Sequence, residues 1–78
     1  MKIQILGPGC SNCRRLAEKA ATAAEELGID CEIEKVEDLQ AIMSFGVMVT
    51  PALVVDGQVK LSGMVPHVSK IKEILAQS

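Results

Sequence analysis

Two cysteines three residues apart, Cys10 and Cys13, are the residues of this sequence whose type and spacing are best suited to chemistry. On the first turn of a helix, positions i and i+3 lie on the same side, within the ~4.4–6.8 Å Cα separation that a disulfide requires. The pair follows an apolar run at residues 2–6 and a Gly-Pro-Gly break at 7–9, and it precedes a helical pattern that begins at Arg14. This spacing predicts a dithiol that forms and breaks a disulfide reversibly.

A helix that begins beside the pair favours the thiolate, because the N-terminus of a helix carries unpaired N–H groups and partial positive charge. Such positions lower a thiol pKa from about 8.5 to about 7. We expect Cys10 to lie before the helix and to be exposed, and Cys13 to be more buried in the first turn. Arg14 and Arg15 add positive charge near Cys10. They either help to stabilise its thiolate or are ordinary solvated surface charges.

Composition limits the classes of function. The chain has 78 residues, 49% of them hydrophobic, and a formal net charge of −2. This length predicts one domain, residues 1–78, and a monomer is the default. Without a basic run or an aromatic platform, nucleic-acid binding has no support. No stretch reaches the ~20 apolar residues of a membrane span, and no signal-peptide pattern is present, so we expect a cytoplasmic protein. In a reducing compartment its three cysteines indicate chemistry.

Hydrophobic periodicity and turn residues predict seven elements in the order βαβαββα. The helix at 14–27 presents an apolar face, expected to comprise Leu16, Ala17, Ala20, Ala21, Ala24 and Leu27. In the short helix at 38–45, we expect Leu39, Ile42 and Met43 to point inward. Pro66 is expected in the first turn of the last helix. The predicted strands are 2–6, 30–36, 52–55 and 58–62, with a hairpin turn at 56–57. The expected fold is α/β, with three helices on both faces of a four-stranded mixed sheet.

The stretches ILGPGCSNC, GVMVTPALVVDGQVKLSG and VPHVSKIKEIL together resemble the thioredoxin-like superfamily, in particular its small archaeal and bacterial redox-active disulfide proteins, which are glutaredoxin-like in size. The likeness covers nearly the whole chain. It implies a protein-disulfide oxidoreductase in which Cys10 attacks and Cys13 resolves. It also implies that Pro51 follows a cis peptide bond and faces the disulfide. Thr50 would offer backbone hydrogen bonds to a bound peptide, and Gly63 and Met64 would border the same groove.

The resemblance further implies the partners. A protein with a disulfide would be the substrate, and a reductase or a low-molecular-weight thiol would supply electrons, with no bound cofactor and no metal. The dipeptide between the cysteines, Ser11-Asn12, is neither the Gly-Pro of thioredoxins nor the Pro-Tyr of many glutaredoxins. Together with Arg14 and Arg15, Ser11 and Asn12 are expected to modulate the pair.

Two other functions stay open at this point. A soft-metal binding or delivery domain would use Cys10 and Cys13 for Cu(I) or Zn(II), with Met64 or Cys31 as a further ligand. Domains of that kind use a βαββαβ order, which differs from the order predicted here. A redox sensor would use the same disulfide as a switch. Cys31 is expected on the buried face of its strand as a small core residue or a third ligand. His67 is expected to be solvated or to serve as a ligand.

Overall fold

The computed structural model describes residues 1–9 and 11–77, so Cys10 and Ser78 lie outside the described residues. Its seven elements follow the predicted βαβαββα order. They are β1 (Lys2–Leu6), α1 (Ser11–Leu27), β2 (Glu32–Val36), α2 (Leu39–Ser44), β3 (Ala52–Val55), β4 (Gln58–Ser62) and α3 (Val68–Ala76). The α/β thioredoxin-like architecture that the sequence indicated is confirmed.

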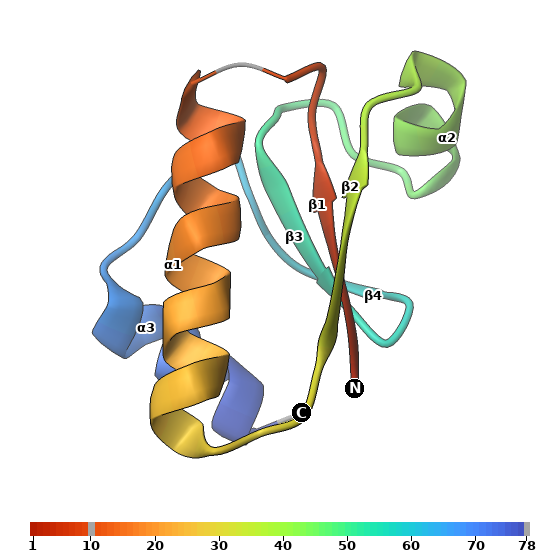
Figure 1. Ribbon diagram of the computed structural model, residues 1–78. Helices are drawn as coiled ribbons and strands as arrows, with labels where there is room; N and C mark the ends of the chain where they lie inside the picture. The colour runs from red at the N-terminus through yellow and green to blue at the C-terminus, as the bar shows by residue number, and fades with distance from the viewer. Residues whose placement is uncertain (10, 78) are drawn as a thin grey trace.

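The sheet is mixed, in the order β2-β1-β3-β4. β1 pairs with β2 in parallel, and it pairs with β3 in the antiparallel sense. β3 and β4 form the predicted hairpin, whose two-residue turn places Asp56 and Gly57 at positive φ angles of 49° and 86°. Asp-Gly suits this turn because both central positions of a type I′ turn need positive φ. Figure 1 shows β1 and β3 at the centre of the sheet, with α1 running along one face.

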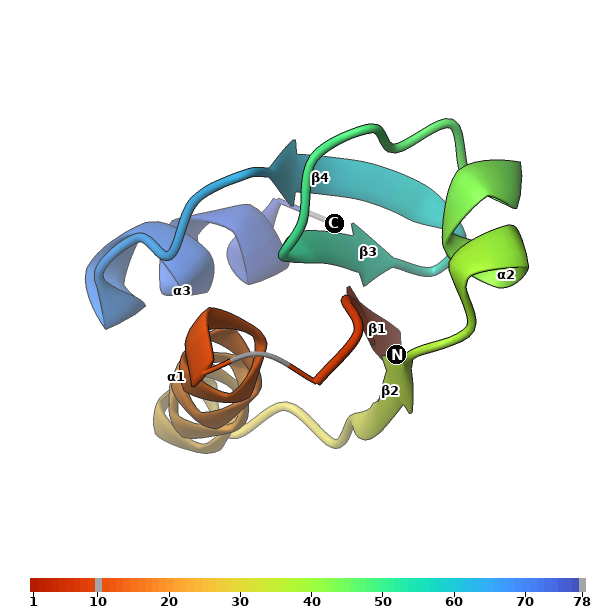
Figure 2. The same cartoon turned by 90° about the horizontal axis from the view of Figure 1, so that it is seen from above.

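Helices cover both faces of the sheet, and each face has its own core. Figure 2 shows α1 and α3 on one side of the sheet and α2 on the other. The α1/α3 core consists of eleven buried residues: Ile3, Ile5, Leu16, Ala17, Ala20, Ala23, Ala24, Leu53, Val55, Ile71 and Leu75. The α2 core has five: Leu6, Ile42, Val47, Ala52 and Val54. Successive residues of β3 alternate between these cores, as the period of two in a strand requires.

The first helix differs from the prediction at its start and on its face. α1 begins at Ser11, three residues before the predicted Arg14. Cys13 therefore lies in its first turn and opens the buried stripe. Ala21, predicted to lie on the apolar face, is exposed, and Ala23, which was not among the predicted residues, is buried. The observed stripe has the spacing of three and four residues that one helix face needs, and Ala21 falls beside it.

Other boundaries also shift. β2 begins at Glu32, so Cys31 precedes the strand and is half-buried against the α1/α3 core, where a buried strand position had been predicted. Pro66 lies before the last helix, whose N-cap is the exposed His67. The prediction that Pro66 belongs to the first turn is therefore wrong.

The short helix departs furthest from its prediction. Ile42 points inward as expected and is 2% exposed. Leu39 and Met43 were also expected to point inward, but they are 63% and 65% exposed. A helix of six residues has one narrow face against the sheet, and Ile42 occupies it. The two longer side chains are left on the surface.

Candidate functional site: the cysteine pair at the start of α1

The cysteine pair lies where β1 leads into α1. β1 ends at Leu6, and the Gly-Pro-Gly segment crosses from the sheet to the helix. Cys10 immediately precedes Ser11, the first residue of α1, but lies outside the described residues. Cys13 is the third residue of the helix and is 6% exposed, so its predicted burial is confirmed. Ser11, Asn12, Arg14 and Arg15 are all exposed around it.

Gly7 shapes the site through its lack of a side chain. It continues β1 by one residue, because its N–H donates a 2.9 Å hydrogen bond to the carbonyl of Val36. A Cβ atom placed on Gly7 would collide with Sγ of Cys13. The backbone of this loop therefore packs directly against the thiol, and only glycine allows so close an approach. Sequence reasoning treated Gly7 as part of a break and missed this contact.

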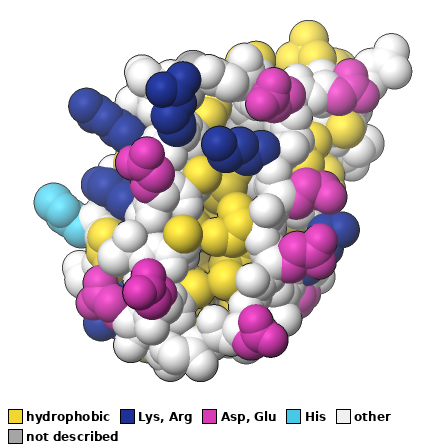
Figure 3. Space-filling view, in the orientation of Figure 1, with side chains coloured by type: hydrophobic (Ala, Val, Ile, Leu, Met, Phe, Trp, Pro, Cys, Tyr) yellow, Lys and Arg dark blue, Asp and Glu magenta, His cyan; other side chains and the backbone are white. Residues whose placement is uncertain are grey.

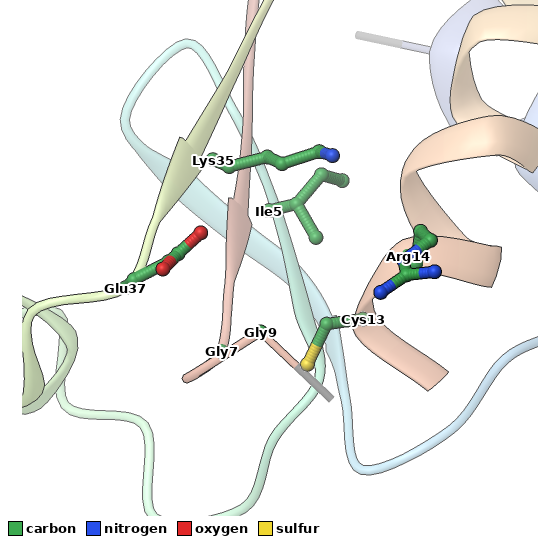
Figure 4. Close-up of a pocket in the computed structure, with 7 residues that line it drawn as sticks. All are labelled: Ile5, Gly7, Gly9, Cys13, Arg14, Lys35 and Glu37. Carbon is green, nitrogen blue, oxygen red and sulfur yellow. The ribbon is translucent and has the colours of Figure 1, made fainter. Parts of the chain in front are cut away.

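A small cavity of about 140 Å³ opens beside Cys13 on the α1 side of the sheet. Its lining includes Ile5, Gly7 and Gly9, together with three charged residues, Arg14, Lys35 and Glu37. Figure 4 shows the side chains of Lys35 and Glu37 reaching in from β2 and the residue after it, opposite Arg14 on α1. Among the described residues, the side chains of these three form no hydrogen bond or ion pair with one another.

Lys35 and Glu37 were not predicted as site residues, although a signal for them exists. β1 and β2 run parallel, with Ile5 opposite Lys35 and Leu6 opposite Val36. Residues that follow two parallel neighbours emerge at the same edge of a sheet. Glu37, directly after β2, therefore lies beside the segment that leads from β1 to Cys10. The carboxylate of Glu37 would be 3.7 Å from a Cβ atom placed on Gly9.

The segment before β3 approaches the Gly7 loop that packs on Cys13. The Thr50–Pro51 peptide bond is cis, as the resemblance implied. The side chain of Thr50 is near Gly7, with 3.8 Å between its Cβ and a Cβ atom placed on Gly7. Thr50 makes no backbone hydrogen bond to another described residue. Its N–H and C=O groups thus have no hydrogen-bond partner among the described residues.

Gly63 and Met64, predicted to border the groove, directly follow β4. The N–H of Gly63 donates a 2.8 Å hydrogen bond to the carbonyl of Pro51, which ties the end of β4 to this segment. Gly63 has φ +74°, and an added Cβ would lie 2.8 Å from Cγ1 of Val49. Both features require glycine. Met64 follows it and is exposed.

An apolar groove of about 580 Å³ runs from Thr50 along α2. The residues that line it are Pro8, Leu39, Ile42, Met43, Gly46, Val47, Met48 and Thr50. Met48 is 97% exposed. Apolar residues predicted to be buried, Leu39 and Met43, thus form one wall of a surface groove that begins next to the candidate site.

Clusters of metal-binding side chains and membrane-spanning helices were both sought in the described part of the chain. Residues 1–9 and 11–77 contain no group of three His, Cys, Asp or Glu side chains that is arranged to hold a metal ion. Over the same residues, no helix has the length and apolar character needed to cross a membrane.

Comparison with known proteins identifies the family. A model of the thioredoxin domain matches residues 1–76. The chain belongs to the thioredoxin domain family. It is 46% identical over 76 residues to a protein named Thioredoxin from Methanothermobacter thermautotrophicus, a match that covers 97% of this chain and 99% of that protein. It is 44% identical over 73 residues to a Thioredoxin from Methanocaldococcus jannaschii, covering 94% of this chain and 84% of the relative.

Membership of the thioredoxin family confirms the class that the sequence indicated, a thioredoxin-like disulfide oxidoreductase. The observed βαβαββα order also differs from the βαββαβ order of the heavy-metal domains considered as an alternative. The geometry around Cys13 bears on the roles of individual residues in this chain.

Proposed function

We propose that this thioredoxin-family chain reduces protein disulfides with Cys10 as the nucleophile and Cys13 as the resolving cysteine. The observation that carries the proposal is the placement of Cys13. Its thiol is 6% exposed, packs against Gly7 and lies in the first turn of α1, one turn from its partner in the motif. A buried second thiol is protected from outside reagents and reacts when a disulfide forms on its neighbour.

The reaction proceeds in two exchange steps. The Cys10 thiolate attacks one sulfur of the partner disulfide, which forms a mixed disulfide and releases the other partner sulfur as a thiolate that takes up a proton. Cys13 then loses its proton and attacks Sγ of Cys10. The bond between Cys10 and the partner breaks, and the second partner thiolate leaves and is protonated. The partner gains two electrons and two protons, and the chain is left with a Cys10–Cys13 disulfide.

The surroundings of the pair fit a protein substrate. Thr50 presents unpaired backbone groups for an extended segment, and the apolar groove beside it continues the contact. Gly63 and Met64 border the segment from the other side. Arg14 and Arg15 lie exposed near the start of α1, where positive charge favours a thiolate. Ser11 and Asn12 fill the exposed turn between the cysteines.

The proposal includes a single domain that acts as a monomer in a reducing compartment such as the cytoplasm, where thiols are kept reduced. A reductase or a low-molecular-weight thiol returns the Cys10–Cys13 disulfide to the dithiol. The exchange chemistry itself requires only the two cysteines and this electron donor.

The test is disulfide reduction of insulin with dithiothreitol as electron donor. Cys10→Ser should remove the catalysed rate. Cys13→Ser should allow attack but not resolution, so a mixed disulfide with the partner accumulates and appears as an added mass. Cys31→Ser is the matched control, because Cys31 lies outside the motif. Full activity in the Cys10→Ser variant would disprove the assignment.

A further inference from the structure

The end of the molecule that carries the cysteine pair has two chemically different sides. On the α2 side is the apolar groove, whose outer wall is formed by Leu39, Met43 and Met48, all more than half exposed. Large apolar side chains that gather on the surface of so small a protein mark an interaction site. Methionine is flexible and polarizable, so such a wall accepts apolar side chains of different shapes.

The α1 side is cationic. Arg14 and Arg15 are exposed near the start of α1, and Lys35 faces Arg14 across the cavity beside Cys13. Figure 3 shows Lys and Arg side chains gathered over the upper part of α1, whereas most Asp and Glu side chains of this face lie lower down or toward the opposite side. The chain as a whole has a net charge of −2, so this concentration of cations is local.

Acidic residues separate the two sides. Glu37 lines the same cavity as Arg14 and Lys35, and Asp38 follows it as the N-cap residue of α2. In the chain, these two carboxylates come between Lys35, which lines the cationic cavity, and Leu39, which lines the groove. An acidic group of a partner is therefore attracted to the α1 side and repelled from the α2 side, which orients the partner.

Both sides are continuous with the reacting pair. Pro8, two residues before Cys10, lines the groove together with Thr50, the residue before Pro51. Arg14 directly follows Cys13 and lines the cavity next to that thiol. The groove and the cationic side thus both reach residues that stand within a few positions of the Cys10–Cys13 motif in the chain.

We propose that the preferred partner is a protein disulfide with a large aliphatic side chain on one flank and an Asp or Glu on the other. The aliphatic side chain enters the groove between Leu39, Met43 and Met48, and the carboxylate pairs with Arg14 or Arg15. This inference rests on the proposed function, since it names the substrate class of the same site. The inference extends the proposed function by assigning the two flanks of the partner disulfide to two separate surfaces of the protein.

The test uses four cyclic peptides, each closed by one disulfide, that combine Leu or Ser on one flank with Glu or Gln on the other. Pre-reduced protein is mixed with each peptide in a single turnover, the reaction is quenched by alkylation, and the second-order rate constant is measured. Two double variants are compared with the wild type. They are Arg14→Gln with Arg15→Gln, and Leu39→Ser with Met43→Ser.

Glu in place of Gln should raise the rate constant about two- to fivefold, as an exposed ion pair does, and the gain should shrink at high salt. The arginine variant should lose this gain and keep the preference for Leu. Leu in place of Ser should raise the rate constant roughly five- to tenfold, with little dependence on salt. The Leu39/Met43 variant should lose that gain and keep the preference for Glu. Lys70→Gln and Val59→Ser, exposed residues on α3 and β4, are matched controls that should keep both.

Equal rate constants for the four peptides would overturn the inference and leave the proposed function standing. Failure to reduce any of the peptides or insulin would instead overturn the proposed function. Absence of a Leu preference at every protein concentration, together with dimers in sedimentation, would show that a second copy occupies the groove. That result would also overturn the inference.

Discussion

The two faces of the sheet are covered to very different extents. On one face α1 and α3 bury eleven residues, and the aliphatic side chains of both helices close the surface. On the other face the six-residue α2 buries five residues and leaves Leu39 and Met43 exposed. The well-covered face supplies most of the stability, whereas the sparsely covered face supplies the groove. The face that supplies most of the stability and the face that carries the groove thus lie on opposite sides of the sheet.

The same substitution on the two faces tests this contrast and should give the largest effect. Ile71 on α3 and Ile42 on α2 are almost equally buried, at 0% and 2% exposed. Ile71→Ala should lower the free energy of unfolding by about 3–5 kcal/mol, because its closed surroundings keep the cavity. Ile42→Ala should cost about 2 kcal/mol, since α2 can settle toward the sheet. Urea unfolding of both variants measures the difference, and equal losses would contradict the contrast.

Gly7→Ala probes how tightly the well-covered side holds Cys13. The new methyl group would collide with Sγ of Cys13, so the loop or α1 must shift, at a cost of about 1–3 kcal/mol. The rate at which Cys13 resolves a mixed disulfide should fall as well. Gly28→Ala is the control, because its added Cβ meets open space and its φ of +67° alone causes strain. The Gly28→Ala variant should lose stability without a change in the rate at which Cys13 resolves a mixed disulfide. A lower resolving rate in both variants would refute the steric explanation.

Removing a charged side chain beside the cavity should have a smaller effect, a shift in the reduction potential. The shift should have one sign for the lysine and the opposite sign for the glutamate. Lys35 favours the reduced form because that form carries a thiolate, and Glu37 disfavours it. Lys35→Met should therefore lower the reduction potential and Glu37→Gln should raise it, each by roughly 5–20 mV. Redox titration measures both. Glu34→Gln, on the same strand but hydrogen-bonded to Gln4, should have no effect. Shifts of equal sign would exclude a role for charge.

Surface substitutions on the sparsely covered face should change stability least. Met43→Ser and Leu39→Ser remove side chains that are mostly exposed, so the free energy of unfolding should stay within about 0.5 kcal/mol of the wild type. Thermal melting measures this. A loss above 2 kcal/mol would show that these side chains belong to the α2 core, and the two faces would then be more alike than the structure indicates.

The sequence predicted the strands best. β1 and β3 are short apolar runs bounded by glycine, proline and the Asp56-Gly57 turn, and each of these signals is local. The start of α1 was missed because Ser11 and Asn12 add nothing to the apolar periodicity. The exposure of Leu39 and Met43 could not be predicted from spacing, since it depends on how little of α2 touches the sheet.

The residues of the candidate site also fall into two groups, those that local sequence signals predict and those that depend on how distant segments pair. Cys10, Cys13 and the Thr50-Pro51 segment could be predicted because each belongs to a short local sequence motif. Lys35 on β2 and Glu37 just after it belong to another part of the chain, and only the register between β1 and β2 brings them to the cavity beside Cys13. A register is a property of two segments together. Residues of this kind emerge once the pairing of the strands is known.

The strand order has a consequence for how the chain is made. β1 lies inside the sheet, between β2 and β3, yet it is synthesised before both. Its second neighbour ends at Val55, so at about 5–20 residues per second the ribosome needs roughly 2–10 s to supply it. During that interval an apolar strand waits with unpaired backbone groups. Synthesis therefore cannot complete this sheet strand by strand, and its centre closes only when the hairpin arrives.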